Sequence, residues 1–269
     1  AGAALCANKD VNHISFTGSV ATGRLVQAAA AYNIVPVTLE LGGKSPQLFF
    51  EDANLGNALP FLVNAGIQNG GQTCSASSRI LVHRSRYDEV IDRMSKKYKE
   101  LIVRPAIEDG ALGPLISERQ KSIVEDFISK GQNINLVAQG EIDSKAPAKG
   151  HYVAPHLFSD VSDDHILAKD EIFGPVQVIM PFDTEEEAIK IANGTDYGLV
   201  ASIWTNDGAR QMRLAKKLKS GQVFINNYGA GGGVELPFGG RGFSGHGREK
   251  GFEALFGFST LKTVASYHQ

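Results

Sequence analysis

A cysteine and a glutamate on two separate glycine turns are the residues of this chain best suited to chemistry. Cys74 lies in the run 69–76 (NGGQTCSA), and Glu40 opens the run 40–44 (ELGGK), thirty-four positions upstream. A thiolate is a strong nucleophile, and a nearby carboxylate can take up a proton or activate a water molecule. The pair therefore predicts covalent catalysis in which Cys74 attacks a substrate and Glu40 acts as general base.

Both residues also have an ordinary structural explanation. A free cysteine is often a buried packing residue, and Glu40 could be a solvated carboxylate with Lys44 as a surface partner in a weak ion pair. However, the neighbours of Cys74 are polar or small, which favours an accessible loop. The two glycines at 42 and 43 suit backbone that turns sharply or approaches a ligand closely.

Two further motifs could hold a nucleotide. The turn at Gly18 and Ser19 can offer backbone N–H groups to a phosphate, although many such turns merely start a helix. In the run 171–175 (EIFGP), Glu171 can accept hydrogen bonds from ribose hydroxyls and Phe173 can pack on a flat ring. A plain turn with an inward aromatic is the alternative for this second motif.

Two glycine-rich runs near the C-terminus, 229–233 (GAGGG) and 237–240 (PFGG), could line a substrate entrance or form a simple connector. The flanking residues Thr73 and Ser75 place no bulky wall beside the thiol.

Composition and charge exclude several classes of protein. The chain has 269 residues, 42% hydrophobic and 21% charged, with a formal net charge of -2. This balance gives no footprint for nucleic acid or an anionic membrane. The seven histidines show no metal-ligand spacing, so no metal is expected. Two cysteines make no disulfide framework, which favours a cytoplasmic setting, and Cys6 is expected to be a packed helical thiol.

The elements that must position these residues alternate between strand and helix, which is typical of an α/β protein. Strands are expected at 11–17, 35–40, 46–50, 79–83, 134–138, 152–158, 176–182, 201–205 and 222–226. Helices are expected at 19–31, 54–67, 86–101, 117–130, 184–193 and 207–217. Each candidate site residue thus falls in a turn or at the end of a strand.

Taken together, five runs resemble the aldehyde dehydrogenase superfamily: 16–19 (FTGS), 40–44 (ELGGK), 71–74 (GQTC), 171–175 (EIFGP) and 237–240 (PFGG). Their order and spacing agree with the family, and the resemblance covers essentially the whole chain. It implies the family's catalytic domain, with an open, twisted, mostly parallel sheet flanked by helices. Remnants of the Rossmann-like cofactor domain would accompany that domain.

The resemblance implies oxidation of an aldehyde to a carboxylic acid with NAD⁺ or NADP⁺. The Cys74 thiolate would attack the carbonyl, hydride transfer would leave a thioester, and Glu40 would activate the hydrolytic water. The backbone N–H of Cys74 would contribute to the oxyanion site. Glu249 resembles a position that the family sometimes uses to relay protons. The positions implied for cofactor binding are Gly18, Ser19, Leu41, Gly42, Glu171 and Phe173.

By the same resemblance, the chain corresponds to the C-terminal portion of a longer protein. Residues 1–42 would be the remnant of the NAD(P)-binding domain and 43–242 the catalytic domain. Residues 243–257 would return to the cofactor domain, and 258–269 would form an oligomerisation strand. Family members carry most of the nucleotide-binding domain further upstream, so the isolated chain is expected to lack dehydrogenase activity. A homodimer or homotetramer is expected.

Two other functions remain open for the chain itself. One is a cofactor-independent thiol esterase that uses only Cys74 and Glu40, and the other is a non-catalytic oligomerising fragment. Because small residues surround the thiol and the run 229–233 resembles the pocket mouth, we expect a roomy site for an aromatic or extended aldehyde. The sequence does not choose between NAD⁺ and NADP⁺.

Overall fold

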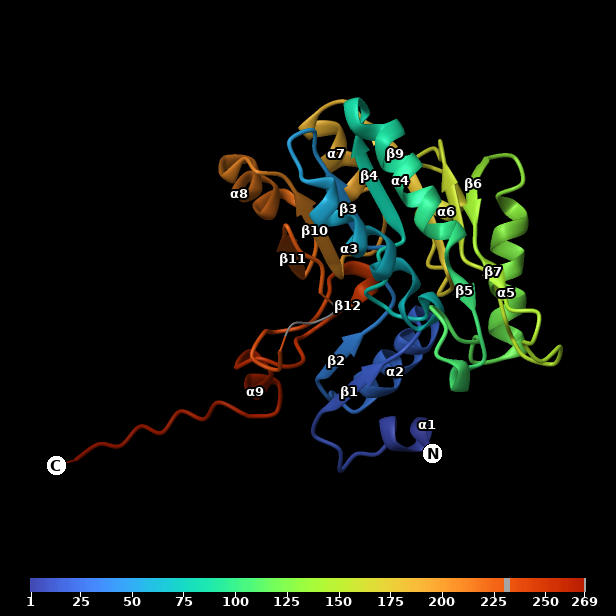
Figure 1. The fold of residues 1–269 in the computed structure, drawn as a ribbon. Coiled ribbons are helices and arrows are strands. Elements are labelled where there is room, and N and C mark those ends of the chain that lie inside the picture. Colours follow the sequence, from blue (N-terminus) through green and yellow to red (C-terminus); the bar gives the residue numbers. More distant parts are fainter. Residues whose placement is uncertain (230–232, 269) are drawn as a thin grey trace.

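Two main sheets organise the protein, a large one and a small one joined by a short connection (Figure 1). The computed structural model describes residues 1–229 and 233–268. Ala230, which belongs to the glycine-rich run 229–233, therefore lies outside the described residues, as do the two glycines after it. In the described ranges, no helix has both the length and the apolar character to cross a membrane.

The small sheet brings the two ends of the sequence together. Its strands are β1 (Ile14–Thr17), β2 (Val37–Glu40) and β12 (Gly245–His246), in the order β1-β2-β12. β1 and β2 are parallel, whereas β12 runs antiparallel to β2 and places Gly245 opposite Glu40. The helices α1 (Gly2–Cys6) and α2 (Val20–Tyr32) pack beside it, and Cys6 is buried in this apolar cluster, as predicted. Residues from near the C-terminus thus complete a sheet that begins near the N-terminus.

The large sheet has seven strands in the order β11-β10-β3-β4-β9-β8-β6. All neighbours are parallel except β6, which runs antiparallel to β8. The predicted open, mostly parallel sheet is therefore confirmed. The strands are β3 (Pro46–Phe49), β4 (Arg79–His83), β6 (Asn135–Gln139), β8 (His156–Ser159), β9 (Val176–Phe182), β10 (Val200–Trp204) and β11 (Gln222–Ile225). A separate pair, β5 (Ile102–Val103) and β7 (Glu141–Ile142), is parallel.

Helices cover both faces of the large sheet. Residues of α3 (Leu55–Ile67) and α4 (Tyr87–Lys99) belong to one apolar cluster. Residues of α5 (Glu118–Lys130), α6 (Ile166–Lys169), α7 (Glu185–Ala192) and α8 (Gly208–Lys217) belong to another. The remaining helical turns are η1 (Gln68–Gly71), η2 (Arg84–Arg86), η3 (Ala106–Glu108), η4 (Gly242–Ser244) and α9 (Glu253–Gly257). Two separate cores on the two faces are the expected arrangement for a parallel sheet.

The starts of α3, α5, α7 and α8 were predicted correctly because a side chain caps each of them. The side chains of Asn54, Ser117, Thr184 and Asp207 accept hydrogen bonds from backbone N–H groups in the first turn. The predicted strand 152–158 was too long at its start, since β8 begins only after Pro155. Proline has no N–H to donate to a strand ladder.

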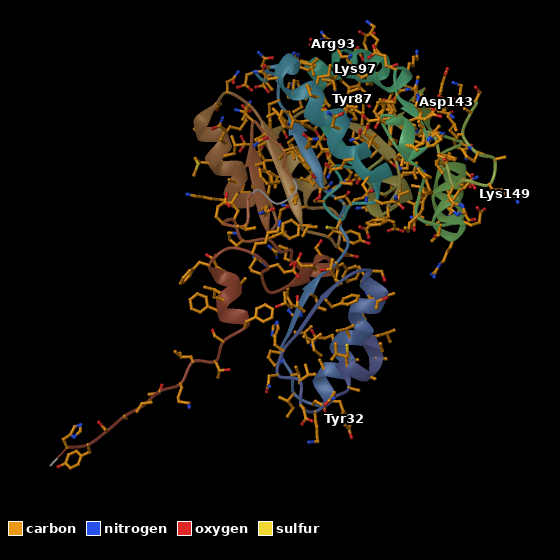
Figure 2. The ribbon with its side chains drawn as sticks, turned by 60° about the horizontal axis from the view of Figure 1, so that its bottom comes forward. Tyr32, Tyr87, Arg93, Lys97, Asp143 and Lys149 are labelled. Carbon is orange, nitrogen blue, oxygen red and sulfur yellow. The ribbon has the colours of Figure 1, made fainter. Side chains whose placement is uncertain are left out.

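The C-terminal tail pairs with no strand in the described chain and extends away from both sheets (Figure 1). Figure 2 shows the same tail from another side, with Tyr32 at the far end of the small-sheet part. Tyr32 is 91% exposed.

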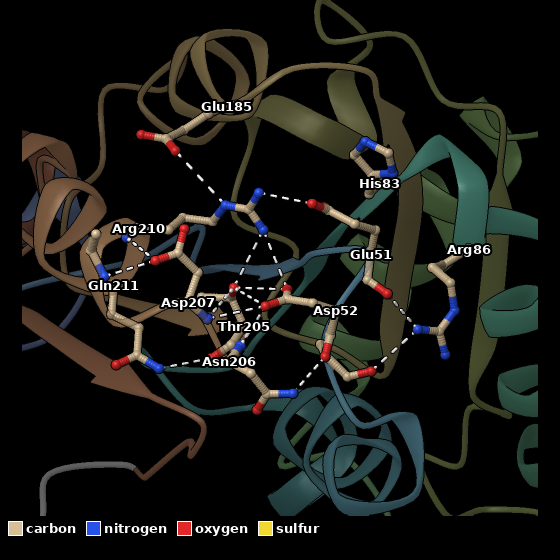
Figure 3. Close-up of polar contacts among 12 residues, drawn as sticks. Glu51, Asp52, His83, Arg86, Glu185, Thr205, Asn206, Asp207, Arg210 and Gln211 are labelled. Carbon is tan, nitrogen blue, oxygen red and sulfur yellow. Dashed lines mark hydrogen bonds and ion pairs between the residues drawn. The ribbon is translucent and has the colours of Figure 1, made fainter.

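A polar cluster lies at the carboxyl ends of β3 and β10 (Figure 3). The Asp52 carboxylate accepts hydrogen bonds from the Thr205 hydroxyl (2.7 Å) and from the backbone N–H groups of Asn206 and Asp207. Arg210 adds an ion pair with Asp52 at 3.2 Å. This cluster ties together the loops after the two strands, at the sheet edge opposite the one described next.

Candidate active site

Cys74 lies on a loop whose backbone is forced into an unusual path by its glycines. In η1, Asn69 and Gly70 both have left-handed backbone, with φ of 54° and 65°, and Gly71 follows with φ of 75°. A side chain at Gly71 would also overlap the carbonyl oxygen of Gly174. Only glycine tolerates both conditions, so the cysteine loop packs directly against the loop that carries Glu171.

The thiol itself is half-buried, between the two sheets. Gly43 packs so closely on the carbonyl oxygen of Cys74 that any Cβ there would overlap it. Phe238 and Tyr228 pack in the same apolar cluster as Cys74. Burial is the main cause that raises the pKa of the Cys74 thiol, and the negative charges of Glu171 and Glu40 raise it further. Hydrogen bonds from the backbone N–H groups of residues 74 and 75 lower it. Both carboxylates are therefore close enough to act on the nucleophile.

Glu40 ends β2 and is 1% exposed. Neither of its carboxylate oxygens has a hydrogen-bond partner among the described residues. Burial raises the pKa of Glu40 to about 8, with a further contribution from Glu249, while Arg248 opposes the shift. A buried carboxyl group with a pKa near neutrality is suited to take up and release a proton at that pH.

Glu249 reaches the same region by pairing with the loop beside Glu40. Its backbone exchanges two hydrogen bonds with Phe238, at 2.6 and 2.7 Å, and its side chain accepts one from the Ser15 hydroxyl at 2.9 Å. The following Gly239 lies against a carboxylate oxygen of Glu40. The structure therefore brings Glu249 beside Glu40.

Glu171 is held by the backbone of the glycine turn, the connection between β2 and β3 that contains Gly42 and Gly43. Its Oε1 accepts the N–H of Gly43 at 3.0 Å. Burial raises the pKa of Glu171, whereas that hydrogen bond and the charge of Lys44 lower it. Phe173, two residues on, is 37% exposed and has left-handed backbone with φ of 55°. Gln120 fixes this turn by donating to the carbonyl oxygens of Ile172 and Phe173.

The remaining predicted cofactor residues divide into exposed and buried ones. Gly18 and Ser19 are exposed where β1 leads into α2. The N–H of Gly18 donates to the carbonyl oxygen of Glu40, and the Ser19 hydroxyl caps α2. Leu41 is instead buried in the small-sheet cluster. Gly42 accepts a hydrogen bond at its carbonyl oxygen from the Ser244 hydroxyl, at 2.7 Å.

These positions fit a dinucleotide. The N-terminus of α2 begins at exposed residues, and the backbone N–H groups of a helix N-terminus suit a phosphate. It lies at the carboxyl ends of β1 and β2, where open α/β sheets bind ligands. Glu171 contacts the backbone of Gly43, and Phe173, two residues on, is exposed. Within the described residues, no group of three or more His, Cys, Asp or Glu side chains could hold a metal ion.

Sequence reasoning misjudged or missed three residues of this region. The suggestion that Lys44 is a surface partner is wrong, because Lys44 is only 2% exposed. Tyr228 was missed; it is buried against Cys74 and donates a hydrogen bond to the carbonyl oxygen of Ser75. Ser244 was missed too, although it joins three segments by binding Gly42 and the N–H of Gly198. Of these three residues, only Lys44 had a sequence feature that could have indicated its burial, namely its position directly after two glycines.

The fold and the site together define an α/β protein with a thiol and two carboxylates at the junction of two sheets. The model of the aldehyde dehydrogenase family matches residues 1–264. Betaine aldehyde dehydrogenase from Rhizobium johnstonii is 40% identical over 266 residues, covering 98% of this chain and 54% of that protein. The chain belongs to the aldehyde dehydrogenase family.

Solved structures agree with this assignment. One from Burkholderia cenocepacia, assigned to the aldehyde dehydrogenases, has a TM-score of 0.96 and 59% identity, over 98% of this chain and 56% of that one. The NAD⁺ complex of the aldehyde dehydrogenase from Bacillus cereus has a TM-score of 0.92 and 40% identity, over 98% of this chain and 53% of that one. The chain thus spans about half the length of the relatives it matches.

Proposed function

We propose that the protein containing this chain oxidises a small aldehyde to a carboxylic acid with NAD⁺ or NADP⁺. The observation that carries the proposal is the convergence of Glu40 and Glu171 on Cys74: both carboxylates are distant from Cys74 in the sequence, yet both raise the pKa of its thiol. Family membership and the bound NAD⁺ of the Bacillus cereus relative support it.

The chain's own residues supply a nucleophile and a base. The Cys74 thiolate adds to the aldehyde carbonyl, and its backbone N–H stabilises the oxygen that becomes negative. A nicotinamide cofactor would supply the acceptor for the hydride of this adduct, which would leave a thioester on Cys74. Glu40 then takes a proton from a water molecule, which attacks the thioester and releases the acid and the Cys74 thiolate. Glu249, whose negative charge raises the pKa of Glu40, would exchange that proton with it.

Cofactor binding in this proposal uses both sides of the glycine turn. Gly18 and Ser19 offer the N-terminus of α2 to the pyrophosphate. Glu171 holds ribose hydroxyls, and Phe173 packs near the nicotinamide ring. Leu41 and Gly42 contribute through the backbone of the turn. The chain spans about half of its relatives, so we propose that the 269 residues alone do not turn over NAD⁺.

The direct test compares two cysteines under the same alkylating reagent. We expect iodoacetamide to label Cys74 before the buried Cys6, as read by mass spectrometry of the peptides. In the longer protein, Cys74→Ala should abolish dehydrogenase activity with NAD⁺, while Cys6→Ala should retain it. Dehydrogenase activity that survives Cys74→Ala would refute the proposal.

A second candidate is a thiol esterase activity of the chain itself. The chain contains both Cys74 and Glu40, and neither residue needs a cofactor to acylate and deacylate. We expect p-nitrophenyl acetate to acylate Cys74, with deacylation that slows in Glu40→Gln. Ester turnover that is unchanged in Cys74→Ala would eliminate this candidate.

The finer features remain proposals of the same kind. Small residues beside Cys74 support a preference for aromatic or extended aldehydes. The rates with benzaldehyde and with acetaldehyde in the longer protein would test this preference.

Two free cysteines support a reducing, cytoplasmic setting. We propose the domain bounds 1–42, 43–242, 243–257 and 258–269; the first boundary separates β2 from β3, which lie in different sheets. We also propose that the chain forms a homodimer or homotetramer; a monomer would count against a purely scaffolding role.

A further inference from the structure

Lys44 is a buried amine without a hydrogen-bond partner for its Nζ among the described residues. It is 2% exposed and lies on the connection from β2 to β3, directly after Gly43. A cavity of about 10 Å³, lined by Lys44, Arg79 and Tyr197 among others, adjoins it. That volume is about one water molecule, so no large ligand reaches the amine.

The cation beside Lys44 does not offer it a partner. Arg79 is fully buried and donates from Nε to the carbonyl oxygen of Lys44 at 3.0 Å. Its two terminal nitrogens donate at 2.8 Å to the last carbonyl groups of α7, at Ile191 and Ala192. Arg79 therefore satisfies backbone oxygens and repels the ammonium of Lys44.

The carboxylates that face Lys44 come from a single loop, the one before β9. They are Asp170, which is exposed, and Glu171, which is buried enough for its pKa to rise. Tyr197, from the loop before β10, contacts the backbone of Glu171. Glu171 is also the residue that the N–H of Gly43 holds, so the backbone of residues 43 and 44 meets it from one side.

We propose that Lys44 is a positioning residue of the candidate active site, whose buried ammonium is the counter-charge of Glu171 and thereby limits the field of Glu171 at Cys74. Lys44 is placed to act through Glu171, because Gly43, the residue before it, donates its N–H to Glu171 and packs on the carbonyl oxygen of Cys74. A neutral residue at 44 would leave Glu171 as an uncompensated anion beside the thiol. The inference uses the proposed function only in taking Cys74 as the reactive group.

The protonation of Lys44 supports this role. Burial lowers the pKa of Lys44 to about 7, helped by Arg79, while Glu171 and Asp170 oppose the shift. As the pH rises through that value, Lys44 loses its charge and the field of Glu171 at Cys74 grows. The pKa of the Cys74 thiol therefore rises as Lys44 is deprotonated, so its alkylation should increase with pH more gradually than for one isolated thiol.

A double-mutant cycle on this chain tests the proposal, with the rate of Cys74 alkylation by iodoacetamide as the readout. At neutral pH we expect Lys44→Met to slow alkylation by roughly three- to tenfold, since one pKa unit changes the thiolate fraction tenfold. Glu171→Gln should accelerate it. In the Glu171→Gln background, Lys44→Met should have little further effect, because the two residues act through one interaction. Lys9→Met, at an exposed lysine, is the control and should change nothing.

Equal slowing by Lys44→Met in both backgrounds would show a merely structural role and overturn the proposal, as would no slowing at all. If Lys44→Met does not fold, Lys44→Arg decides. Arginine stays charged at alkaline pH, so the rate of Cys74 alkylation should rise with pH over the narrower range of a single thiol ionisation. A dependence of that rate on pH unchanged from the unaltered chain would overturn the proposal. The alkylation experiment needs no cofactor. A failure of the proposed dehydrogenase function would therefore not change its result, and a failure of the Lys44 proposal would not bear on the dehydrogenase function.

Discussion

Burial and two nearby carboxyl groups make ionisation of the Cys74 thiol harder. Glu171 and Glu40 both raise the pKa of Cys74, and Glu249 raises the pKa of Glu40. Burial and neighbouring negative charge thus both disfavour the Cys74 thiolate in the resting site. A cationic nicotinamide held by Glu171 would offset this negative charge and favour the Cys74 thiolate.

Glu40 should make the stability of the protein depend on pH. Its pKa is about 8 in the folded chain against an ordinary value of 4.5, so the folded state binds the proton more tightly. Stability is thus highest below pH 4.5 for this group and is lost as the pH rises through about 8. Since one pKa unit corresponds to about 1.4 kcal/mol, the loss is on the order of a few kcal/mol.

Urea unfolding of Glu40→Gln at several pH values checks this expectation. Measurements below pH 7 exclude the effect of Lys44. Its lowered pKa makes the folded state more stable as the pH rises from about 7 to 10.5, which is opposite to the effect of Glu40. We expect the variant to lose the decline in stability that the unaltered chain shows. Glu108→Gln, at an exposed residue, should keep the decline. A decline of the same slope in Glu40→Gln would contradict the prediction.

Among the elements, the glycine turn between β2 and β3 controls how closely the cysteine loop approaches. Gly43→Ala would drive a methyl group into the carbonyl oxygen of Cys74. We expect the variant to lose about 1–3 kcal/mol of stability by overpacking and to alter the alkylation rate of Cys74. Gly113→Ala is a matched control, because nothing lies within 4 Å of the added Cβ. Equal behaviour of both variants in thermal unfolding and alkylation would exclude this role of the turn.

At the opposite edge of the large sheet, the cluster of Figure 3 should serve stability alone. Asp52→Ala leaves the Thr205 hydroxyl without its acceptor and removes one of the hydrogen bonds of Arg210. Buried donors without a partner cost about 1–3 kcal/mol, so we expect a lower midpoint in urea. The alkylation rate of Cys74 should not change, since the thiol precedes β4 and the cluster follows β3 and β10. Asp163→Ala, at an exposed residue, is the control, and slower alkylation in Asp52→Ala would contradict the separation of the two edges.

At the scale of the whole molecule, the tail 258–268 offers apolar side chains to a second chain. Leu261, Val264 and Tyr267 are 97%, 83% and 87% exposed. Deletion of residues 258–269 should therefore reduce the mass of the assembly in size-exclusion chromatography with light scattering. Val264→Ser should weaken the assembly without shortening the chain. An unchanged mass in both variants would refute the predicted oligomerisation strand.

Local sequence signals sufficed for most elements and for the candidate residues. Alternating strand residues and capping side chains such as Thr184 depend on neighbours within a few positions, so they can be read without the fold. The glycines before Cys74 likewise indicate left-handed backbone, and those after Glu40 indicate a close approach of other residues. The start of β8 was predicted four residues too early because the apolar run continues across Pro155. The proline lies outside the strand because it has no N–H to donate to the neighbouring strand.

By itself, the sequence determined the α/β class, the family and the residue types that do the chemistry, because these depend on short motifs and their order. Only the tertiary structure decided that Lys44 is buried, that Glu40 has no partner for its carboxylate, and that Ser244 joins three segments. Burial and charge at a site come from residues distant in sequence. The protonation of Cys74 and Glu40 therefore becomes readable only once the two sheets meet around them.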